Sequence, residues 1–182
     1  MRKKNIIIVS VSIMVLWVGL IGIGEESRSS EKKNERIRVG IYDSRAVAVA
    51  YAHSDYFRKK LDEKKQELEK AKSDGDTEKV KALEAWGSEG QHKMHLQGFG
   101  SAPVRDLLEP VKDSLPEIAR SCGVDIIVSQ WLIDYQAPNA ELVDITNEMI
   151  KPFKPNERVL NIVESMKDKS PISEAEIMKH DH

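Results

Sequence analysis

The stretch GVDIIVSQWLIDYQAPNAELVDIT, residues 123–146, predicts two short β-strands followed by a helix. Its continuous apolar run, Ile126 to Val128, is typical of a buried strand over Asp125–Ser129. Large side chains then alternate with polar or smaller neighbours, so we expect a second strand over Gln130–Tyr135. A gap that contains a proline comes next, and Asp144 after it is well placed to cap a helix.

Alternating apolar residues farther upstream predict another strand, Arg38–Tyr42. Asp43 or Ser44 can then cap a helix, because its side-chain oxygen can accept a bond from a free backbone N–H group. The small apolar residues of that helix, Ala46–Ala52, suit close packing against a sheet. We expect the strand near residue 40 and those near residue 130 to be neighbours in one sheet, although they lie far apart in sequence.

The charged segment over about residues 53–100 predicts an antiparallel helical hairpin that protrudes as an arm. Its first helix has an apolar seam at heptad spacing, with Lys64 and Ala71 also on the seam. Asp76 or Thr77 can cap the second helix, which has an apolar edge of its own. The residues that we expect to pair the helices or to contact a client are Phe57, Leu61, Leu68, Val80, Leu83 and Trp86.

Glycines predict that the second helix of the arm is interrupted. Gly87 and Gly90, and Gly98 and Gly100 farther on, would each cost about 1 kcal/mol relative to alanine inside a helix. The stretch QGFGSAP, residues 97–103, is therefore expected to end the arm, with Pro103 at the first position of the next helix.

Short helices are predicted for the rest of the chain. Pro110 should break the helical run that follows the arm, and Gly123 should close the next helix. Asn156 should begin another helix, and Ser173 with Glu176 forms a capping box for a last turn. The apolar face expected on the Asn156 helix consists of Val159, Leu160, Val163 and Met166. Together these elements predict an α+β fold, with a small β-sheet body, a protruding helical hairpin and flanking short helices.

The N-terminus predicts export from the cytoplasm. Three basic residues, Arg2–Lys4, precede an uncharged apolar stretch, residues 6–23, which is about long enough to cross a bilayer. Residues 1–24 are therefore interpreted as a signal peptide or as a helix retained in the inner membrane. Removing them would lower the formal charge from −2 to −5, because three of the 28 cations are lost against 30 acidic residues. This acidic balance argues against a nucleic-acid partner.

The remaining domain boundaries follow from composition. Residues 25–36 are polar and charged, as a linker would be, and residues 37–154 contain the expected sheet and arm. Residues 155–182 are expected to form a helical tail.

The order of these elements resembles the Skp/OmpH family of periplasmic chaperones. The resemblance covers residues 38–153, and its most specific part is the series IIVS, WLIDY and DITNEMI near the C-terminal end. The segment HLQGFGSAPV is similar to a short-armed branch of that family. The resemblance implies a homotrimer whose strands join the subunits, and helical arms that enclose unfolded outer-membrane polypeptides. The residues assigned to the oligomeric body are Val39, Ile41, Ile127, Trp131, Ile133 and Tyr135.

Two functions follow as hypotheses. The first is an exported, periplasmic chaperone that holds unfolded or envelope polypeptides through its arms. The alternative is an oligomeric scaffold tethered to the inner membrane, whose arms dock one folded partner.

No pattern in the sequence favours an enzyme or a cofactor site. His92 and His95 could share a helix face with Glu89, but we interpret them as solvated residues and not as metal ligands. Asp125, Asp134 and Asp144 are spaced along strands and caps, and no nucleophile motif accompanies them. Cys122 is the only cysteine, so no disulfide can form within one chain, and we expect a small buried thiol.

Overall fold

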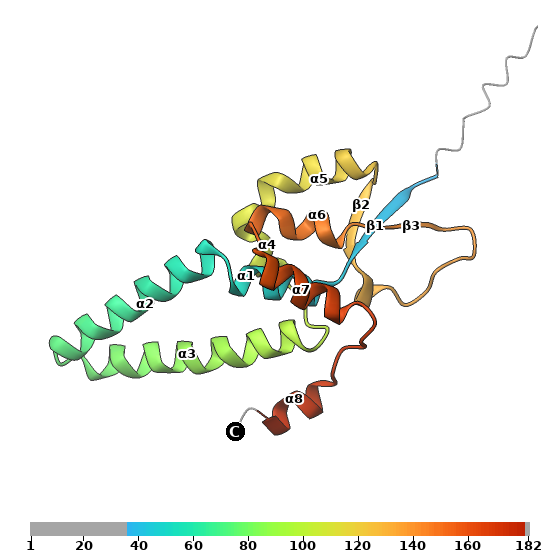
Figure 1. The fold of residues 1–182 in the computed structure, drawn as a ribbon. Helices are drawn as coiled ribbons and strands as arrows, with labels where there is room; N and C mark the ends of the chain where they lie inside the picture. The colour runs from blue at the N-terminus through green and yellow to red at the C-terminus, as the bar shows by residue number, and fades with distance from the viewer. Residues whose placement is uncertain (1–35, 181–182) are drawn as a thin grey trace, which may run out of the picture. The chain divides into compact units, whose positions relative to one another are not determined.

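The computed structural model describes residues 36–180, which lie within one compact unit. The expected signal or membrane segment, residues 1–24, falls outside the described residues. The fold of the described part is α+β, as predicted (Figure 1). Its strands are β1 Arg38–Tyr42, β2 Ile126–Ser129 and β3 Glu141–Asp144. Its α-helices are α1 Ser44–Ala52, α2 Asp55–Ser73, α3 Thr77–Gly98, α4 Arg105–Leu108, α5 Leu115–Cys122, α6 Thr146–Ile150, α7 Glu157–Met166 and α8 Glu174–His180.

Within the described residues, the three strands form one parallel sheet in the order β2-β1-β3. Val39 is opposite Ile126 on one side and opposite Leu142 on the other, so β1 is the central strand. The prediction that segments near residues 40 and 130 pair in one sheet is confirmed. At Gly40 a side chain would be crowded, because an added Cβ would lie 2.8 Å from Ile145 Cδ1 and 3.0 Å from Val124 Cγ2.

The predicted strand Gln130–Tyr135 is wrong. Gln130–Leu132 forms the 3₁₀ helix η2, and the third strand, β3, lies in the stretch taken for a gap. Since β2 and β3 both run parallel to β1, residues 130–140 must carry the chain back to the starting edge of the sheet. The hydroxyl of Ser129 accepts a bond from the Trp131 backbone N–H group at 3.4 Å, which helps to end β2 there.

Helix α1 lies at the centre of the hydrophobic core. Its alanines and valines are small, so α2, α3, α6 and α7 all contact it. The core also takes in residues from α4, α5 and the 3₁₀ helices η1, Glu109–Ser114, and η3, Lys151–Phe153. Core residues with no exposed surface include Val47, Met149, Ile150 and Val159.

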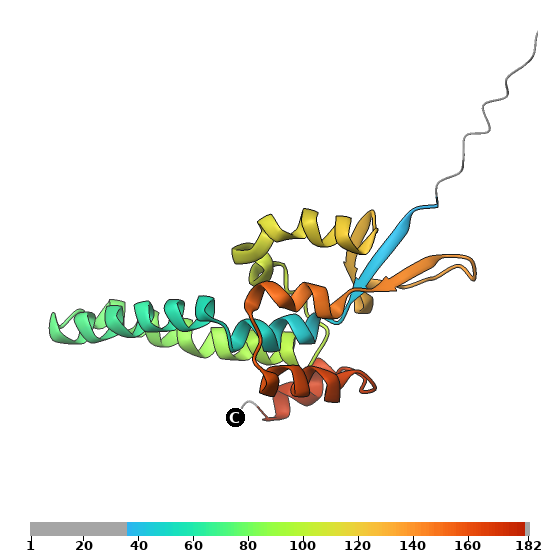
Figure 2. The same ribbon diagram turned by 45° about the horizontal axis from the view of Figure 1, so that its top comes forward.

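Helices α2 and α3 lie side by side, on the opposite side of α1 from the strands (Figures 1 and 2). Asp76, one of the two predicted caps of α3, accepts a bond from Lys79 N, and Ser54, which was not predicted as a cap, accepts one from Phe57 N at the start of α2. The predicted interruption of the second helix is wrong, since α3 continues through Gly87 and Gly90. Good helix formers around the glycines and the packing of α3 on α2 outweigh their cost.

One predicted helix start is wrong by two residues, and the other predicted helix ends described next are confirmed. Pro103 precedes α4, whose first residue is Arg105. Pro110 falls in η1 and separates α4 from α5, so the predicted break is confirmed. Gly123 closes α5 with a positive φ of 62°, and Asn156 caps α7, both as predicted. On α7, Val159 and Val163 are buried, whereas Leu160 is 44% exposed because it lies off the face that meets α1.

Candidate functional site: a free sheet face and a cleft in the helical arm

The residues expected to form an oligomeric body lie in four different places. Val39 and Ile41 are on one face of β1, and Ile127 is on the opposite face of β2, where it packs against the core. Trp131 is in η2, at the carboxyl ends of the strands. Ile133 and Tyr135 lie in the connection to β3, where Tyr135 is 80% exposed.

One face of the sheet is apolar and lies outside the hydrophobic core. Side chains alternate along a strand, so the residues opposite the core-facing Gly40, Ile127 and Val143 share this second face. We call it the free sheet face, and it consists of Val39, Ile41, Ile126, Val128 and Leu142. None of these residues belongs to the core cluster, and Ile126 is 47% exposed. Because parallel sheets are normally covered on both faces, this face is a candidate association surface.

A buried polar cluster fills the carboxyl end of the central strand. The Arg45 guanidinium donates to Asp43 Oδ2 at 2.6 Å, and the Trp131 indole N–H donates to Asp43 Oδ1 at 3.0 Å. Arg45 also lies over the Trp131 ring, 4.9 Å from its centroid. The side chains of Arg45 and Asp43 are only 4% and 10% exposed, so each charge is stabilised mainly by the other.

The same cluster joins the strands to the C-terminal helices. Asp43 donates its backbone N–H to Thr146 Oγ1 at 3.0 Å, and that hydroxyl donates to Asp144 Oδ1 at 2.6 Å. Asp144 also accepts from the Thr146 backbone N–H, although it is the last residue of β3 and not a helix cap in the usual position. Arg45 donates to the Met166 carbonyl of α7 at 3.1 Å.

This cluster occupies the place where α/β proteins commonly bind ligands, outside the carboxyl ends of parallel strands. In this protein the side chains at that place form hydrogen bonds with one another, so we assign the cluster a structural role. The sequence predicts Asp43 or Ser44 as the cap, but it does not predict Arg45 as the partner of the Asp43 carboxylate. One signal could have revealed Arg45: it is the only charged residue in the otherwise small and apolar helix sequence SRAVAVAYA.

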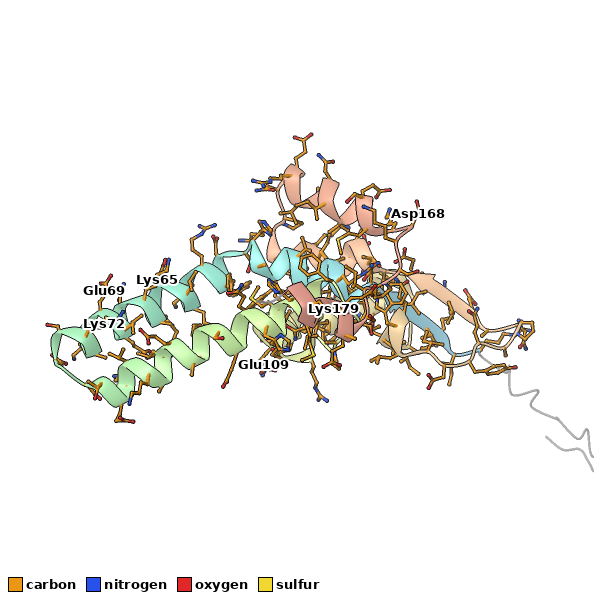
Figure 3. All side chains as sticks on the ribbon, turned by 90° about the horizontal axis from the view of Figure 1, so that it is seen from below. Lys65, Glu69, Lys72, Glu109, Asp168 and Lys179 are labelled. Atoms are coloured by element: carbon orange, nitrogen blue, oxygen red, sulfur yellow. The ribbon has the colours of Figure 1, made fainter. Side chains whose placement is uncertain are left out.

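The apolar residues expected in the arm are all half-buried. Phe57, Leu61 and Leu68 lie on α2, and Val80, Leu83 and Trp86 lie on α3. Ala71, near the end of α2, is fully buried. The side of α2 that faces away from α3 is charged, and Figure 3 shows Lys65 and Glu69 there. The arm therefore combines an apolar seam with a polar outer surface.

A cleft opens at the base of the arm, between α2 and α3. We call it the arm cleft, and its volume is about 570 Å³. Its apolar wall contains residues that the sequence analysis did not assign to a site, Met94 and Leu107, beside Phe57, Leu61 and Trp86. The ammonium groups of Lys60 and Lys64 lie 5.8 and 5.9 Å from the centroid of the Trp86 ring. Such distances allow a cation–π attraction between each lysine and the indole.

Polar residues close the inner end of the arm cleft. Gln97 is 1% exposed, and its Nε2 donates to the Pro103 carbonyl and to Asp106 Oδ1, both at 2.8 Å. Its Oε1 is buried and accepts no hydrogen bond from any described residue. Burial works to raise the pKa of Asp106, but hydrogen bonds from Lys93 and Gln97 outweigh this and lower it. Burial and then the Asp106 charge raise the pKa of Tyr51, which also lines the cleft.

Two glycines of α3 form part of the wall of the arm cleft. Gly87 and Gly90 both line it, and a Cβ added at either position would meet no other atom of residues 36–180 within 4 Å. Neither glycine has a positive φ, so alanine would fit the backbone at both positions.

The side chains considered for metal binding or catalysis do not converge. Over residues 36–180, no group of three or more His, Cys, Asp or Glu side chains has the arrangement of a metal site. The His95 ring packs against Phe99, with 5.7 Å between centroids. Asp125 accepts from the Arg38 backbone N–H at 2.8 Å and so fixes the start of β1. Asp134 is exposed, and Cys122 is a half-buried free thiol.

Comparison with known proteins found no matching family model, curated protein or solved structure. In the part of the chain that the structure describes, no helix has the length and apolar character needed to cross a membrane.

Proposed function

We propose that this protein is an exported, self-associating chaperone that holds non-native polypeptides and does not act as an enzyme. The observation that carries the proposal is that one charged chain has two separate apolar surfaces. The free sheet face provides a surface for self-association, and the apolar seam of the arm provides a surface for a client.

Self-association through the free sheet face explains why a parallel sheet has one face outside the core. Covering Val39, Ile126 and Leu142 with the same face of other copies would remove them from water. We propose a trimer in the periplasm, in line with the family that the sequence resembles. Residues 6–23 would direct export and, if retained, would attach the trimer to the inner membrane.

Client binding through the arm explains why its apolar residues are only half-buried. Helices α2 and α3 pack on each other, yet Leu61, Leu83 and Trp86 keep part of their surface accessible. Charged side chains such as Lys65 and Glu69 would keep the complex with an unfolded client in solution.

A light-scattering assay tests this function. A urea-denatured outer-membrane protein is diluted into buffer with an excess of residues 25–182, a fragment that contains the whole hydrophobic core. We expect less aggregation, and we expect Leu61→Ser with Leu83→Ser to abolish the effect. A control variant on the outer side of the arm, Lys65→Ser with Glu69→Ser, should retain it. Unchanged aggregation with the wild-type fragment would refute the holdase activity.

Crosslinking in intact cells separates this proposal from the membrane-tethered scaffold. A chaperone should crosslink to many unfolded envelope precursors. A single folded partner would support the scaffold instead.

A further inference from the structure

We propose that the arm cleft is a site for one apolar side chain of an extended client segment in which the neighbouring residue is acidic. This inference rests on the proposed function, because it names where a client is held and which client sequences are preferred. Three features of the cleft support it: the glycines of α3, the apolar wall and the positive charge of Lys60.

The glycines are not explained by packing within the chain. Gly87 and Gly90 lie inside a continuous helix, where alanine is the better helix former. Since a Cβ at either position would meet no atom within 4 Å, no described neighbour requires a glycine there. Both glycines line the arm cleft, so their effect is to leave space above the α3 backbone. An approaching main chain can use that space.

The wall of the cleft suits an apolar side chain. Trp86, Met94 and Leu61 offer an aromatic ring, a flexible thioether and a branched aliphatic group. Methionine adapts to differently shaped partners, and tryptophan provides a large contact area. The cleft is partly open to solvent, as binding to an extended chain requires.

The charged residues of the cleft determine which client residue is preferred next to the apolar one. Lys93 pairs with Asp106 at 2.9 Å, and Lys64 pairs with Glu67 at 2.8 Å, so these two cations are already compensated. Lys60 lines the cleft and has no carboxylate within 4.0 Å among the described residues. Glu89 is the remaining charged lining residue and belongs to α3. The α2 side of the cleft thus carries one uncompensated positive charge, that of Lys60, and an acidic client residue would be attracted to it.

Labelled peptides measure the preference. The probes are unstructured 15-residue peptides of glycine and serine with one central phenylalanine, flanked either by two glutamates or by two lysines. Fluorescence anisotropy with residues 25–182 should show tighter binding of the glutamate peptide, by about threefold, as for an exposed charge pair. Replacing its phenylalanine with glycine should abolish binding. Equal affinity of the two charged peptides, or no binding of either, would overturn the proposal.

The variants Gly87→Ala and Gly90→Ala distinguish a role of these glycines in binding from a purely structural role. Each should raise the Tm by about 2–4 °C, because alanine is the better helix former. Each should also weaken binding of the glutamate peptide by about tenfold, because the added methyl group fills part of the cleft. Gly98→Ala is the matched control, since Gly98 also has an open Cβ position but does not line the cleft. It should leave peptide binding unchanged. Stabilised glycine variants with unchanged affinity would refute the site.

Reversal of one charge tests the lysine. Lys60→Glu should turn the preference toward the lysine-flanked peptide, whereas Lys65→Glu on the outer side of α2 should leave it unchanged. A preference for the glutamate peptide that survives Lys60→Glu would contradict the role assigned to Lys60.

The two proposals can fail separately. If the wild type suppresses aggregation and the glycine variants bind peptide and suppress aggregation equally well, the cleft assignment fails and the chaperone function stands. If the peptide pattern holds but aggregation is not suppressed, the site stands and the holdase function fails.

Discussion

Replacing Asp43 with alanine should destabilise the fold more than any exposed charge change would. The Asp43 carboxylate accepts from the Arg45 backbone N–H at 2.9 Å, from Arg45 Nη2 at 2.6 Å and from Trp131 Nε1 at 3.0 Å. Asp43→Ala removes all of these acceptors at once. It leaves the guanidinium of Arg45, which is 4% exposed, with the Met166 carbonyl as its remaining acceptor.

The size of the effect follows from the burial of the pair. Removing one partner of a buried ion pair costs about 3–5 kcal/mol, chiefly because the other charge remains in the interior. Loss of the helix cap costs about 1 kcal/mol by itself, but the two effects share atoms and do not add fully. We therefore expect Asp43→Ala to lower the free energy of unfolding by about 4 kcal/mol, a large part of the total for a domain of this size.

Urea unfolding of residues 25–182, followed by circular dichroism, measures this loss. Glu141→Ala is the control, because the Arg38–Glu141 pair is equally short at 2.6 Å but its side chains are 39% and 49% exposed. That variant should lose less than about 1 kcal/mol. The double variant Asp43→Ala with Arg45→Met should recover at least about 1 kcal/mol over Asp43→Ala, because no buried charge remains. A loss below 1 kcal/mol for Asp43→Ala, or no recovery in the double variant, would show that the buried-charge reasoning is wrong.

Three further predictions concern packing, exposure and pH. Gly40→Ala should lower the free energy of unfolding by about 1–3 kcal/mol in thermal melts, since its Cβ would lie 2.8 Å from Ile145 Cδ1. Ile145→Ala, in the core, should cost about 2–5 kcal/mol, whereas Ile126→Ser should cost the isolated subunit less than about 1 kcal/mol. The pKa of Asp106 is lowered in the folded state, so its stabilisation is lost as pH falls through that lowered pKa, below the ordinary 3.8. Asp106→Asn should therefore flatten the acid side of the stability profile, and an unchanged profile would exclude this contribution.

Local sequence signals predicted the elements well where one residue fixes a boundary. Asp43, Asp76 and Asn156 each cap a helix, and Gly123 closes one, because each choice depends only on nearby backbone groups. The central strand was also evident from its alternation. These signals are short-range and act whatever the rest of the fold does.

The errors arose where tertiary contacts decide the structure. The alternation of Trp131, Ile133 and Tyr135 suggested a strand, but the Trp131 indole binds Asp43 and Arg45 from a 3₁₀ helix. The third strand, Glu141–Asp144, has little pattern of its own and depends on pairing with β1. Gly87 and Gly90 suggested a break, yet packing between α2 and α3 keeps the helix continuous. The arm cleft depends on how these helices meet, which local periodicity does not specify.

Self-association can be measured by sedimentation equilibrium of residues 25–182 over a range of protein concentrations. We expect a species with three times the mass of one chain, and we expect Ile126→Ser with Leu142→Ser to reduce it to single chains that keep their helical circular dichroism. A wild-type fragment that stays monomeric at every concentration, or a trimer that withstands both substitutions, would contradict association through the free sheet face.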